Sequence, residues 1–211
     1  MNKQICLDFD DWSVLNNRLD LFVKLKEAYP RLKVSLFTIP YDYSYEMDVS
    51  GRIMRENTIK EIKKHLSWME FVPHGLMHLE REFEKCSYET MKNNIFPAID
   101  ECFKRDNLPY VKGFKAPYWL WNDGVVKALD EAGWWGAIDR NQVYIKPTKK
   151  FYVYTHNIFE PFWDSTLDVL KLHGHMTNKM PDNIEKNFVN LFKMPADAEF
   201  KFASEMLNET T

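Results

Sequence analysis

The stretch QICLDFDD, residues 4–11, decides the fold, because it predicts a buried strand that ends on three carboxylates. Its apolar half is short and rich in strand-forming residues, as in a strand covered on both faces. Asp8, Asp10 and Asp11 lie so close together that they repel one another, so solvent, a cation or a metal must compensate their charge. An acidic helix N-terminus, stabilised by the helix macrodipole, is the structural alternative.

The positions of the three aspartates set a condition on the backbone. Strand alternation places Asp8 and Asp10 on one face of the sheet and Asp11 on the other. Asp10 and Asp11 therefore enter one site only if the chain turns at the end of the strand. The sequence allows this turn, because a loop is predicted to begin at Trp12.

Outward from this stretch, short apolar runs alternate with longer amphipathic ones. Strands separated by helices favour a parallel sheet with right-handed crossovers, hence an α/β barrel or an open α/β sheet. No linker or internal repeat interrupts residues 1–211, which are predicted to form a single domain. Further strands are predicted at residues 33–40, 69–75, 111–117, 134–139, 151–156, 168–175 and 199–206. Helices are predicted at residues 13–29, 56–66, 86–106, 122–133 and 183–192.

Several residues mark the ends of these predicted helices. Ser13 and Ser87 are expected to be N-caps of the first and third helices. Pro97 predicts a kink or restart inside the third helix. The fourth helix is expected to start at a cap formed by Asn122 or Asp123 and to end at Gly133.

Polar clusters follow the predicted strands at five points. The carboxyl ends of parallel strands share one face of a barrel, which is where the catalytic groups of such folds assemble. We therefore expect these clusters to form one site. They are DFDD at 8–11, PHGLMH at 73–78, FKAPYW at 114–119, AIDRN at 137–141 and KLHGH at 171–175.

His74 and His78 are four residues apart, which on a helical turn brings both imidazoles close enough to share a metal ion. Pro73 and Gly75 indicate a strand-to-helix turn at this point. Two independent surface or capping histidines are the alternative. Two imidazoles and one carboxylate leave open positions on a zinc, nickel, cobalt, manganese or iron ion.

The neighbouring polar residues fit hydrolysis at such an ion. The metal acidifies water into a nucleophile near neutral pH, and a second carboxylate beside it can serve as general base. His173 and His175 are candidates for the general acid that protonates the leaving group. Metal, base and acid together are the working parts of amide or ester hydrolysis.

The composition excludes several classes of function. The 211 residues carry a formal net charge of −3, so no global basic field is available to hold nucleic acid. No apolar run has the length of a signal peptide or a membrane span, so neither is expected. Cys6, Cys86 and Cys102 lack CxxC spacing and are expected to be buried thiols of a reducing compartment. We accordingly expect a cytoplasmic protein that binds neither nucleic acid nor membrane.

The motifs together resemble those of the NodB-type polysaccharide deacetylases, carbohydrate esterases that remove N- or O-acetyl groups from sugars. The family motifs run in the order TFDD, H-[ST]-x-x-H, R-x-P, a segment with tryptophan and aspartate, and a leucine–histidine strand end. The resemblance covers roughly residues 4–176 and implies a distorted (β/α) barrel of about seven parallel strands. The counterparts here are DFDD at 8–11, HGLMH at 74–78, KAPYW at 115–119, WGAIDRN at 135–141 and LKLHGH at 170–175.

The resemblance implies one divalent metal ion and a base beside it. Asp11, His74 and His78 match the metal ligands of the family, and Asp10 matches its general base. Zinc is the first choice of metal, with nickel, cobalt and manganese as alternatives.

The resemblance also implies the groups that handle protons and charge. His173 matches the general acid, because it follows leucine as the histidine of the family does. His175 is a second candidate for the acid, or else a residue that orients His173. Asp139 matches an aspartate that tunes proton transfer, with a capping or surface role as the alternative. A backbone N–H near Tyr118 is expected to stabilise the oxyanion.

Three positions depart from the family pattern. Lys115 stands where the family has an arginine that orients the base, so the planar fork of the arginine is lost. Gly75 replaces the usual serine or threonine of the histidine motif. Trp12 follows the aspartate pair where glycine is common, which would narrow the cleft.

Aromatic residues beside the motifs are candidates for contacts with a sugar, because their faces stack on pyranose rings. Trp12, Trp119 and Trp121 are the tryptophans expected at the cleft, with Pro117 and Tyr118 beside them, although packing in a bulky core is the general alternative. The segment from Pro40 to Arg55 is either one wall of this cleft or a solvated connection.

These observations favour a metal-dependent hydrolase that removes an acetyl group from an acetylated glycan or a small acylated sugar. Hydrolysis of a non-sugar amide is a variant of the same chemistry. Two other classes remain as alternatives. One is a non-haem iron oxygenase with a facial triad of two histidines and an aspartate. The other is a non-catalytic carbohydrate-binding or assembly protein on a deacetylase scaffold.

Overall fold

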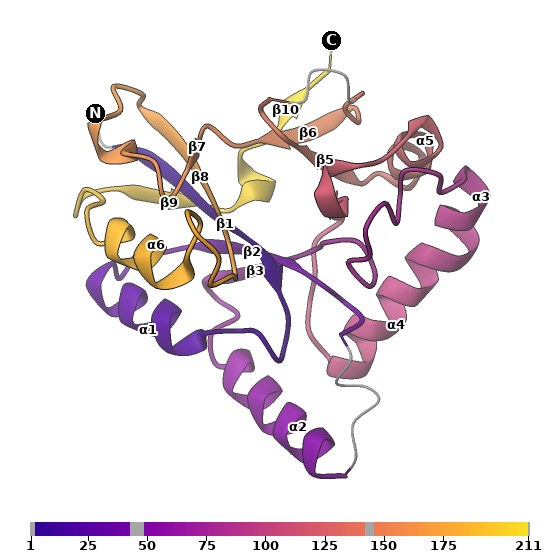
Figure 1. Ribbon diagram of the computed structural model, residues 1–211, viewed down its shortest axis with the longest axis horizontal. Coiled ribbons are helices and arrows are strands. Elements are labelled where there is room, and N and C mark those ends of the chain that lie inside the picture. The colour runs from indigo at the N-terminus through magenta and orange to yellow at the C-terminus, as the bar shows by residue number, and fades with distance from the viewer. Residues whose placement is uncertain (1–2, 43–48, 142–145, 211) are drawn as a thin grey trace.

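The computed structural model describes residues 3–42, 49–141 and 146–210. Helices pack on the outside of a central sheet, and both chain ends lie at the upper rim of the molecule in Figure 1. The stretch that begins the chain forms strand β1 (Gln4–Trp12), which is almost wholly buried. Its position at the centre of the sheet confirms the predicted buried strand.

Parallel pairing builds the first sheet around β1. Its strand order is β3-β2-β1-β8-β7, and β9 pairs with the first residues of β1. Every one of these pairs is parallel. The other strands of this sheet are β2 (Val34–Thr38), β3 (Met69–Pro73), β7 (His156–Asn157), β8 (Val169–His175) and β9 (Glu199–Lys201).

The second sheet has the order β10-β6-β5-β4. It consists of β4 (Gly113–Lys115), β5 (Trp135–Ile138), β6 (Lys150–Val153) and the antiparallel edge strand β10 (Asn208–Glu209). Among the described residues, an isolated parallel bridge between His74 and Lys115 joins the two sheets. The α/β class and the mostly parallel sheet are thereby confirmed, but the ladders of the described residues do not close into a ring, so the distorted barrel is open.

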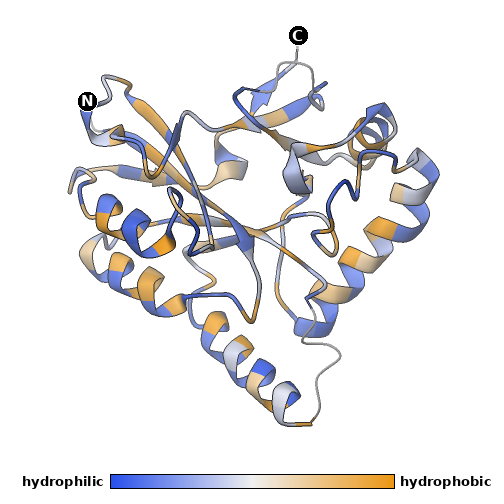
Figure 2. Cartoon of the chain, in the orientation of Figure 1, coloured by the Kyte–Doolittle hydropathy of each residue, from blue (hydrophilic) through white to orange (hydrophobic). Residues whose placement is uncertain are grey.

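The helices lie on the outside of the sheets, and hydrophobic and hydrophilic residues alternate along them (Figures 1 and 2). Ser87 accepts a hydrogen bond from the N–H of Thr90, and Asn122 caps its helix through two N–H groups, so both predicted caps are confirmed. Gly133 ends that helix with φ +71°. The helices are α1 (Leu19–Ala28), α2 (Val49–Lys63), α3 (Tyr88–Thr90), α4 (Phe96–Asp106), α5 (Asp123–Ala132) and α6 (Ile184–Leu191).

The predicted third helix is divided as expected. A π-helical turn at Met91–Ile95 separates α3 from α4, which restarts with Pro97 in its first turn. Proline has no N–H to donate, so the first turn of a new helix is the position where it fits.

The first helix differs from its prediction. Ser13 does not cap it, because the Ser13 hydroxyl accepts from the N–H of Asn16 in a local turn. The Asn17 side chain then accepts from the N–H of Leu19, where α1 begins. Local hydrogen bonds of Ser and Asn therefore replace the first turns of the predicted helix.

Two further boundaries differ from the predictions. Helix α2 begins at Val49, inside the segment 40–55 that was predicted to be a loop or cleft wall, and residues 43–48 of that segment lie outside the described residues. The last predicted strand is shorter, because a 3₁₀ turn at Ala203–Glu205 follows β9.

The core on the α1 and α6 side of β1 is aromatic. The Phe9 ring lies 5.1 Å from that of Phe22 and 5.6 Å from that of Phe188 between centroids. All three rings are buried, and they fix the strand against both helices. Cys6, Cys86 and Cys102 are buried free thiols, as predicted. Among the described residues, none of the helices has both the length and the apolar character needed to cross a membrane.

Candidate active site

The carboxyl ends of β1, β3, β4 and β8 meet at one edge of the sheets, where most of the predicted site residues come together. Asp10 and Asp11 end β1, and His173 and His175 end β8 in register with Asp8 and Asp10. The motifs were expected to meet because each follows the carboxyl end of a predicted strand. In the structure these strand ends do lie at one edge of the sheets. His74 and His78 follow β3, and Lys115 ends β4.

The backbone turns at Asp11, as the aspartate spacing required. Asp11 has φ +61°, and the pairing of β1 with β2 is irregular between Phe9 and Trp12. A positive φ is unfavourable for a residue with a side chain, although Asp and Asn tolerate it best. The result is that the neighbouring carboxylates of Asp10 and Asp11 face the same site.

Asp11, His74 and His78 form a compact group of three possible metal ligands. Asp11 Oδ1 lies 2.9 Å from His78 Nε2 and 3.4 Å from His74 Nε2. The His74 Nδ1 atom contacts the carbonyl oxygen of Lys115 at 3.1 Å, which directs Nε2 towards Asp11. A backbone carbonyl on the second ring nitrogen is a common way to orient a histidine ligand.

The turn that carries His78 is held by a residue that sequence reasoning missed. Glu82 accepts hydrogen bonds from the N–H groups of Leu76 and Met77, at 3.3 and 3.2 Å. His78 itself has φ +58°, and Gly75 has φ +66°. Glu82 follows the histidine motif by four residues in a polar run, and nothing in that run distinguished it.

These three residues fit a divalent metal ion. Asp11 Oδ1 is buried and accepts no hydrogen bond from the part of the chain that the structure describes. Ligand bonds of about 2.0–2.2 Å separate neighbouring ligand atoms by roughly 3–3.6 Å, which is close to the spacing found here. Burial raises the pKa of Asp11, but the His74 and His78 imidazoles outweigh it and hold the pKa well below its usual range. Asp11 is therefore the ionised carboxylate that a cation requires.

Lys115 and Asp10 form a buried ion pair beside these ligands. Lys115 Nζ lies 2.6 Å from Asp10 Oδ1, and its ammonium is also 4.3 Å from the Phe37 ring and 4.0 Å from the Trp119 ring. Burial raises the pKa of Asp10, but the charge of Lys115, followed by that of His173, lowers it to about 2. Lys115 therefore contacts Asp10, the carboxylate that an arginine is expected to orient in the deacetylase motifs that this sequence resembles.

His173 is oriented by Asp8, a contact that sequence reasoning did not predict. His173 Nδ1 lies 2.6 Å from Asp8 Oδ1, and His173 Nε2 lies 3.9 Å from Asp10 Oδ2. The second oxygen of Asp8 accepts a hydrogen bond of 2.6 Å from the Tyr152 hydroxyl. Burial, followed by the charge of Asp8, raises the pKa of Tyr152, which keeps this hydroxyl a donor.

His175 lies beside His173 and faces the same carboxylate. Its Nε2 atom is 3.8 Å from Asp10 Oδ2, and its Nδ1 atom contacts Asp182. Burial lowers the pKa of His175, but the hydrogen bond with Asp182, followed by the charge of Asp10, raises it to about 9. Asp182 is in turn bonded by the side-chain amide of Asn187. About one third of the His175 side chain is exposed, so it borders the open side of the site.

Asp139 lies further from His173, on the other side of the Tyr154 side chain. Its Oδ1 atom accepts from the Tyr154 hydroxyl at 3.2 Å and from the N–H of Asn141. The Tyr154 ring packs against the His173 ring with 4.6 Å between centroids. Tyr154 therefore separates Asp139 from the histidine with which the sequence resemblance connected it.

The predicted aromatic residues have different positions. Tyr118 is 53% exposed, has φ +56° and lies 5.5 Å from the His78 ring, at the mouth of the site. Trp119 is half-buried between Lys115 and His173. Tyr118 and Trp119 thus border the site, and their predicted contact with a sugar stays a prediction.

The other aromatic and proline candidates are buried or turned away. Trp12 is 1% exposed and packs on Phe71 at 5.0 Å, so its ring belongs to the core and not to the cleft. The reason is that β1 continues to Trp12 and turns it inward. Trp121 is half-buried and stacks on Phe114, and Pro117 is buried beside Gly75.

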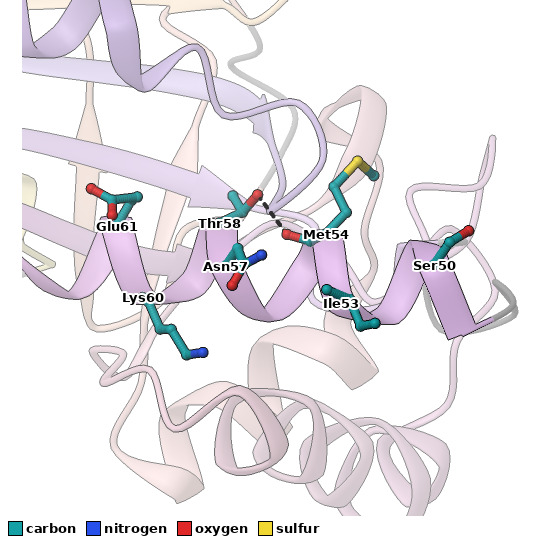
Figure 3. Close-up of a pocket in the computed structure, with 7 residues that line it drawn as sticks. All are labelled: Ser50, Ile53, Met54, Asn57, Thr58, Lys60 and Glu61. Atoms are coloured by element: carbon teal, nitrogen blue, oxygen red, sulfur yellow. Dashed lines mark hydrogen bonds between the residues drawn. The ribbon is translucent and has the colours of Figure 1, made fainter.

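A separate hollow lies away from these residues. It has a volume of about 590 Å³ and runs along one side of α2, where it is lined by a single helix (Figure 3). The hydrogen bond drawn there, from the Thr58 hydroxyl to the Met54 carbonyl, is an ordinary contact of a helix with its own backbone. Among the described residues that line this hollow, none belongs to the ligand group Asp11, His74 and His78 or is one of the neighbouring residues Asp10, His173 and His175.

Comparison with known proteins gives a fold. No family model matches the sequence, and no curated protein sequence matches it. Solved structures do match. The Bc1960 peptidoglycan N-acetylglucosamine deacetylase has a TM-score of 0.61 at 16% identity, over 96% of this chain and 87% of that one. A family 4 acetyl xylan esterase from Clostridium thermocellum, solved with a cobalt ion, has a TM-score of 0.61 at 14% identity, over 96% and 89%.

A protein described as a pseudoenzyme also has this fold. BA3943 from Bacillus anthracis, a CE4 family pseudoenzyme, has a TM-score of 0.58 at 12% identity. The alignment covers 97% of this chain but only 65% of BA3943, so the chain spans about two thirds of that protein. The chain therefore has the fold of the CE4 family carbohydrate esterases and deacetylases, as its motifs predicted.

Proposed function

We propose that this protein is a metal-dependent deacetylase that hydrolyses the acetyl group of an N- or O-acetylated sugar. One observation carries the proposal. A group of three metal ligands, Asp11, His74 and His78, lies beside a buried carboxylate, Asp10, and an oriented imidazole, His173. A metal site alone would suit many proteins. A base and an acid next to it are what hydrolysis requires.

Asp11, His74 and His78 would hold the ion. The metal, when bound, supplies Lewis-acid polarisation of an acyl carbonyl and lowers the pKa of water. Zinc is the first choice for two imidazoles and one carboxylate, and cobalt or nickel suit the same donors. The cobalt ion in the structurally similar acetyl xylan esterase supports a divalent metal in this fold.

Asp10 acts as the general base. Its Oδ2 atom lies 3.8 Å from His74 Nε2, so it borders the ligand group without belonging to it. Oδ1 is occupied by the Lys115 ammonium, which leaves Oδ2 to accept the proton of the attacking water. Lys115 holds the carboxylate in place and compensates its charge, so that Asp10 and Asp11 can both stay ionised side by side.

His173 acts as the general acid. Its Nδ1 side is bonded to Asp8, so Nε2 is the nitrogen that faces Asp10 and the site. From this position Nε2 can protonate the departing amine or alkoxide. The proton on Nδ1 stays on the imidazole, hydrogen-bonded to Asp8. His175, with its Nδ1 bonded to Asp182, is the neighbour that contributes positive charge to the same region.

Sugar as the substrate class is supported by the aromatic border and by the structural neighbours. Tyr118 and Trp119 lie next to His78 and His173, where a ring could stack on their faces. The neighbouring structures include proteins described as a peptidoglycan N-acetylglucosamine deacetylase and an acetyl xylan esterase. We therefore expect a pyranose that carries the acetyl group.

Metal content and acetate release test the proposal together. Wild type, His78→Ala and His65→Ala are purified without chelator, and metal per chain is measured. His65 is a matched control because it follows α2 and packs on Trp68, away from the site. We expect about one equivalent of metal in wild type and His65→Ala, and a marked loss in His78→Ala. Acetate release from N-acetylglucosamine oligomers or acetylated xylan follows the same order.

Two results would contradict the proposal as a whole, and a third would contradict its sugar substrate. Wild type that takes up no metal, even with added zinc, cobalt or nickel, would exclude the metal centre. Wild type that binds metal and acetylated sugar but releases no acetate would indicate a binding or assembly protein. Release of acyl groups from simple amides, but not from sugars, would keep the chemistry and exclude the sugar.

A further inference from the structure

Asp8 is a fully buried carboxylate at the back of the site, three residues before the metal ligand Asp11. It is 0% exposed, and both of its oxygens have donors. Oδ1 lies 2.6 Å from His173 Nδ1, and Oδ2 accepts from the Tyr152 hydroxyl at 2.6 Å. A buried carboxylate is costly unless such donors compensate it. The proposed hydrolysis by Asp10 and His173 does not by itself require this residue.

The backbone fixes this contact. In the parallel ladder of β1 and β8, Asp8 is the partner of His173 and Asp10 is the partner of His175. Side chains two residues apart on a strand point to the same face, so both aspartates project towards the histidines. The pairing of Asp8 with His173 therefore follows from the strand register and not from a loop.

The same site lacks a direct contact between His173 and Asp139. Asp139 bonds the Tyr154 hydroxyl, and the Tyr154 ring lies against the imidazole. Asp139 is half-buried on the outer side of Tyr154, whereas Asp8 is enclosed behind the imidazole.

We propose that Asp8, supported by Tyr152, is the positioning residue that fixes the tautomer and the direction of His173, in place of the Asp139 that the sequence motifs indicated. This inference rests on the proposed function, because it assigns the group that prepares its general acid. An ionised carboxylate accepts hydrogen bonds and does not donate them, so the proton of His173 lies on Nδ1. Nε2 is then the nitrogen that gains and loses a proton towards the substrate.

This arrangement has a clear chemical consequence. When His173 gains a second proton on Nε2, Asp8 stabilises the imidazolium through the charge-assisted bond at Nδ1. When Nε2 gives up its proton to the leaving group, the Nδ1 proton stays in place and the ring cannot turn. Asp8 contacts neither metal nor substrate in this scheme, and acts only through His173.

The charges around Asp8 and Asp10 support different roles for these two carboxylates. Lys115 Nζ lies 2.6 Å from Asp10 but 3.6 Å from Asp8, so the ammonium binds mainly to the base. Asp8 Oδ1 is closer to His173 Nδ1, at 2.6 Å, than to the ammonium, and Asp8 Oδ2 accepts from Tyr152. Lys115 Nζ also lies 3.5 Å from His173 Nδ1, so one buried cation compensates both carboxylates, while the short hydrogen bonds of Asp8 are those with His173 and Tyr152.

Nuclear magnetic resonance of the histidine side chains tests the proposal without any activity. Long-range proton–nitrogen spectra of chain labelled at the imidazole nitrogens distinguish the Nδ1–H tautomer from the Nε2–H tautomer, and His173→Gln identifies the signals. We expect Nδ1–H in wild type and in Asp139→Asn. In Asp8→Asn the amide N–H₂ faces Nδ1, so the proton moves to Nε2. An unchanged tautomer in Asp8→Asn, or a changed one in Asp139→Asn, overturns the proposal.

Tyr152→Phe provides a test if Asp8→Asn does not fold. It removes one donor from Asp8 and adds no polar group. The carboxylate then bonds His173 more strongly, and the Nδ1 proton resonance moves downfield. A resonance that stays in place in Tyr152→Phe would show that Asp8 does not hold this ring.

Kinetics separate this role from a purely structural one. We expect Asp8→Asn to lower kcat by about 100-fold or more at constant metal content, with little change in KM. Asp139→Asn lowers kcat by less. If no variant releases acetate but the tautomers respond as described, the proposed function fails and the role of Asp8 as the orienting residue stands.

Discussion

Lys115 Nζ and Asp10 Oδ1 lie 2.6 Å apart in the interior, where the lysine side chain is 0% exposed and the aspartate 2%. A buried pair of this kind is worth little compared with an apolar pair, but removing one partner leaves an uncompensated charge. The Lys115 ammonium also lies over the rings of Phe37 and Trp119, 4.3 and 4.0 Å from their centroids.

Lys115→Met should therefore lower the free energy of unfolding by about 3–5 kcal/mol, because Asp10 keeps its charge and loses its cation. Urea denaturation measures the change. Lys127→Met on α5 is the matched control, since Lys127 is 63% exposed and should change the stability by less than about 0.5 kcal/mol. Equal stability of Lys115→Met and wild type would mean that the pair does not form in solution.

We expect a serine at position 75 to destabilise the protein, although the deacetylase motifs that this sequence resembles carry serine or threonine there. A Cβ at this position would lie 2.6 Å from Pro117 Cγ and 2.8 Å from Glu82 Oε2, and φ is +66°. We expect Gly75→Ser to cost about 2–4 kcal/mol and to weaken metal binding through His74 and His78.

The control for this substitution is Gly133→Ala, at the end of α5. Gly133 also has positive φ, +71°, but nothing lies within 4 Å of an added Cβ. Its cost should be about 1 kcal/mol, from the backbone conformation alone. Similar costs at both glycines would show that Gly75 has space for a side chain.

The fold could be predicted from the sequence where local signals decide it. The strands that carry the motifs and the caps at Ser87 and Asn122 follow from periodicity and cap preference. The grouping of Asp11 with His74 and His78 was implied by the resemblance to the deacetylase motifs, since the spacing of the two histidines alone is weak evidence. The turn at Asp11 could also be inferred, because two adjacent carboxylates can share a site only if the strand turns.

Contacts between strands that are distant in the sequence could not be predicted in this way. The partner of His173 depends on the register between β1 and β8, which a single sequence does not reveal. Strand alternation did place Asp8 on the face of Asp10, but it did not place His173 opposite Asp8. Trp12 shows the same limit, because its inward direction depends on the irregular end of β1.

His175 and Asp182 give a pH dependence of stability. The pKa of His175 in the folded protein is about 9, above the value of about 6.5 for an unfolded histidine. This pair therefore contributes fully below about pH 6.5, and its contribution is lost as the pH rises through about 9. Since one third of the imidazole is exposed, the contribution is about 1 kcal/mol or less.

Asp182→Asn should remove most of that dependence. Unfolding free energies of wild type and Asp182→Asn, measured with chelator from pH 6 to 10, should converge as the pH rises. A constant difference over this range would show that His175 does not titrate against Asp182.

Asp10→Asn tests the central claim most directly, because it changes one atom of the base and leaves the three ligands in place. Acetate released from an N-acetylglucosamine oligomer is measured for wild type and Asp10→Asn at equal metal content. We predict release by wild type and a loss of about 100-fold or more in Asp10→Asn. Full activity of Asp10→Asn at equal metal content would contradict the mechanism, and no release by metal-loaded wild type from any acetylated sugar would contradict the function.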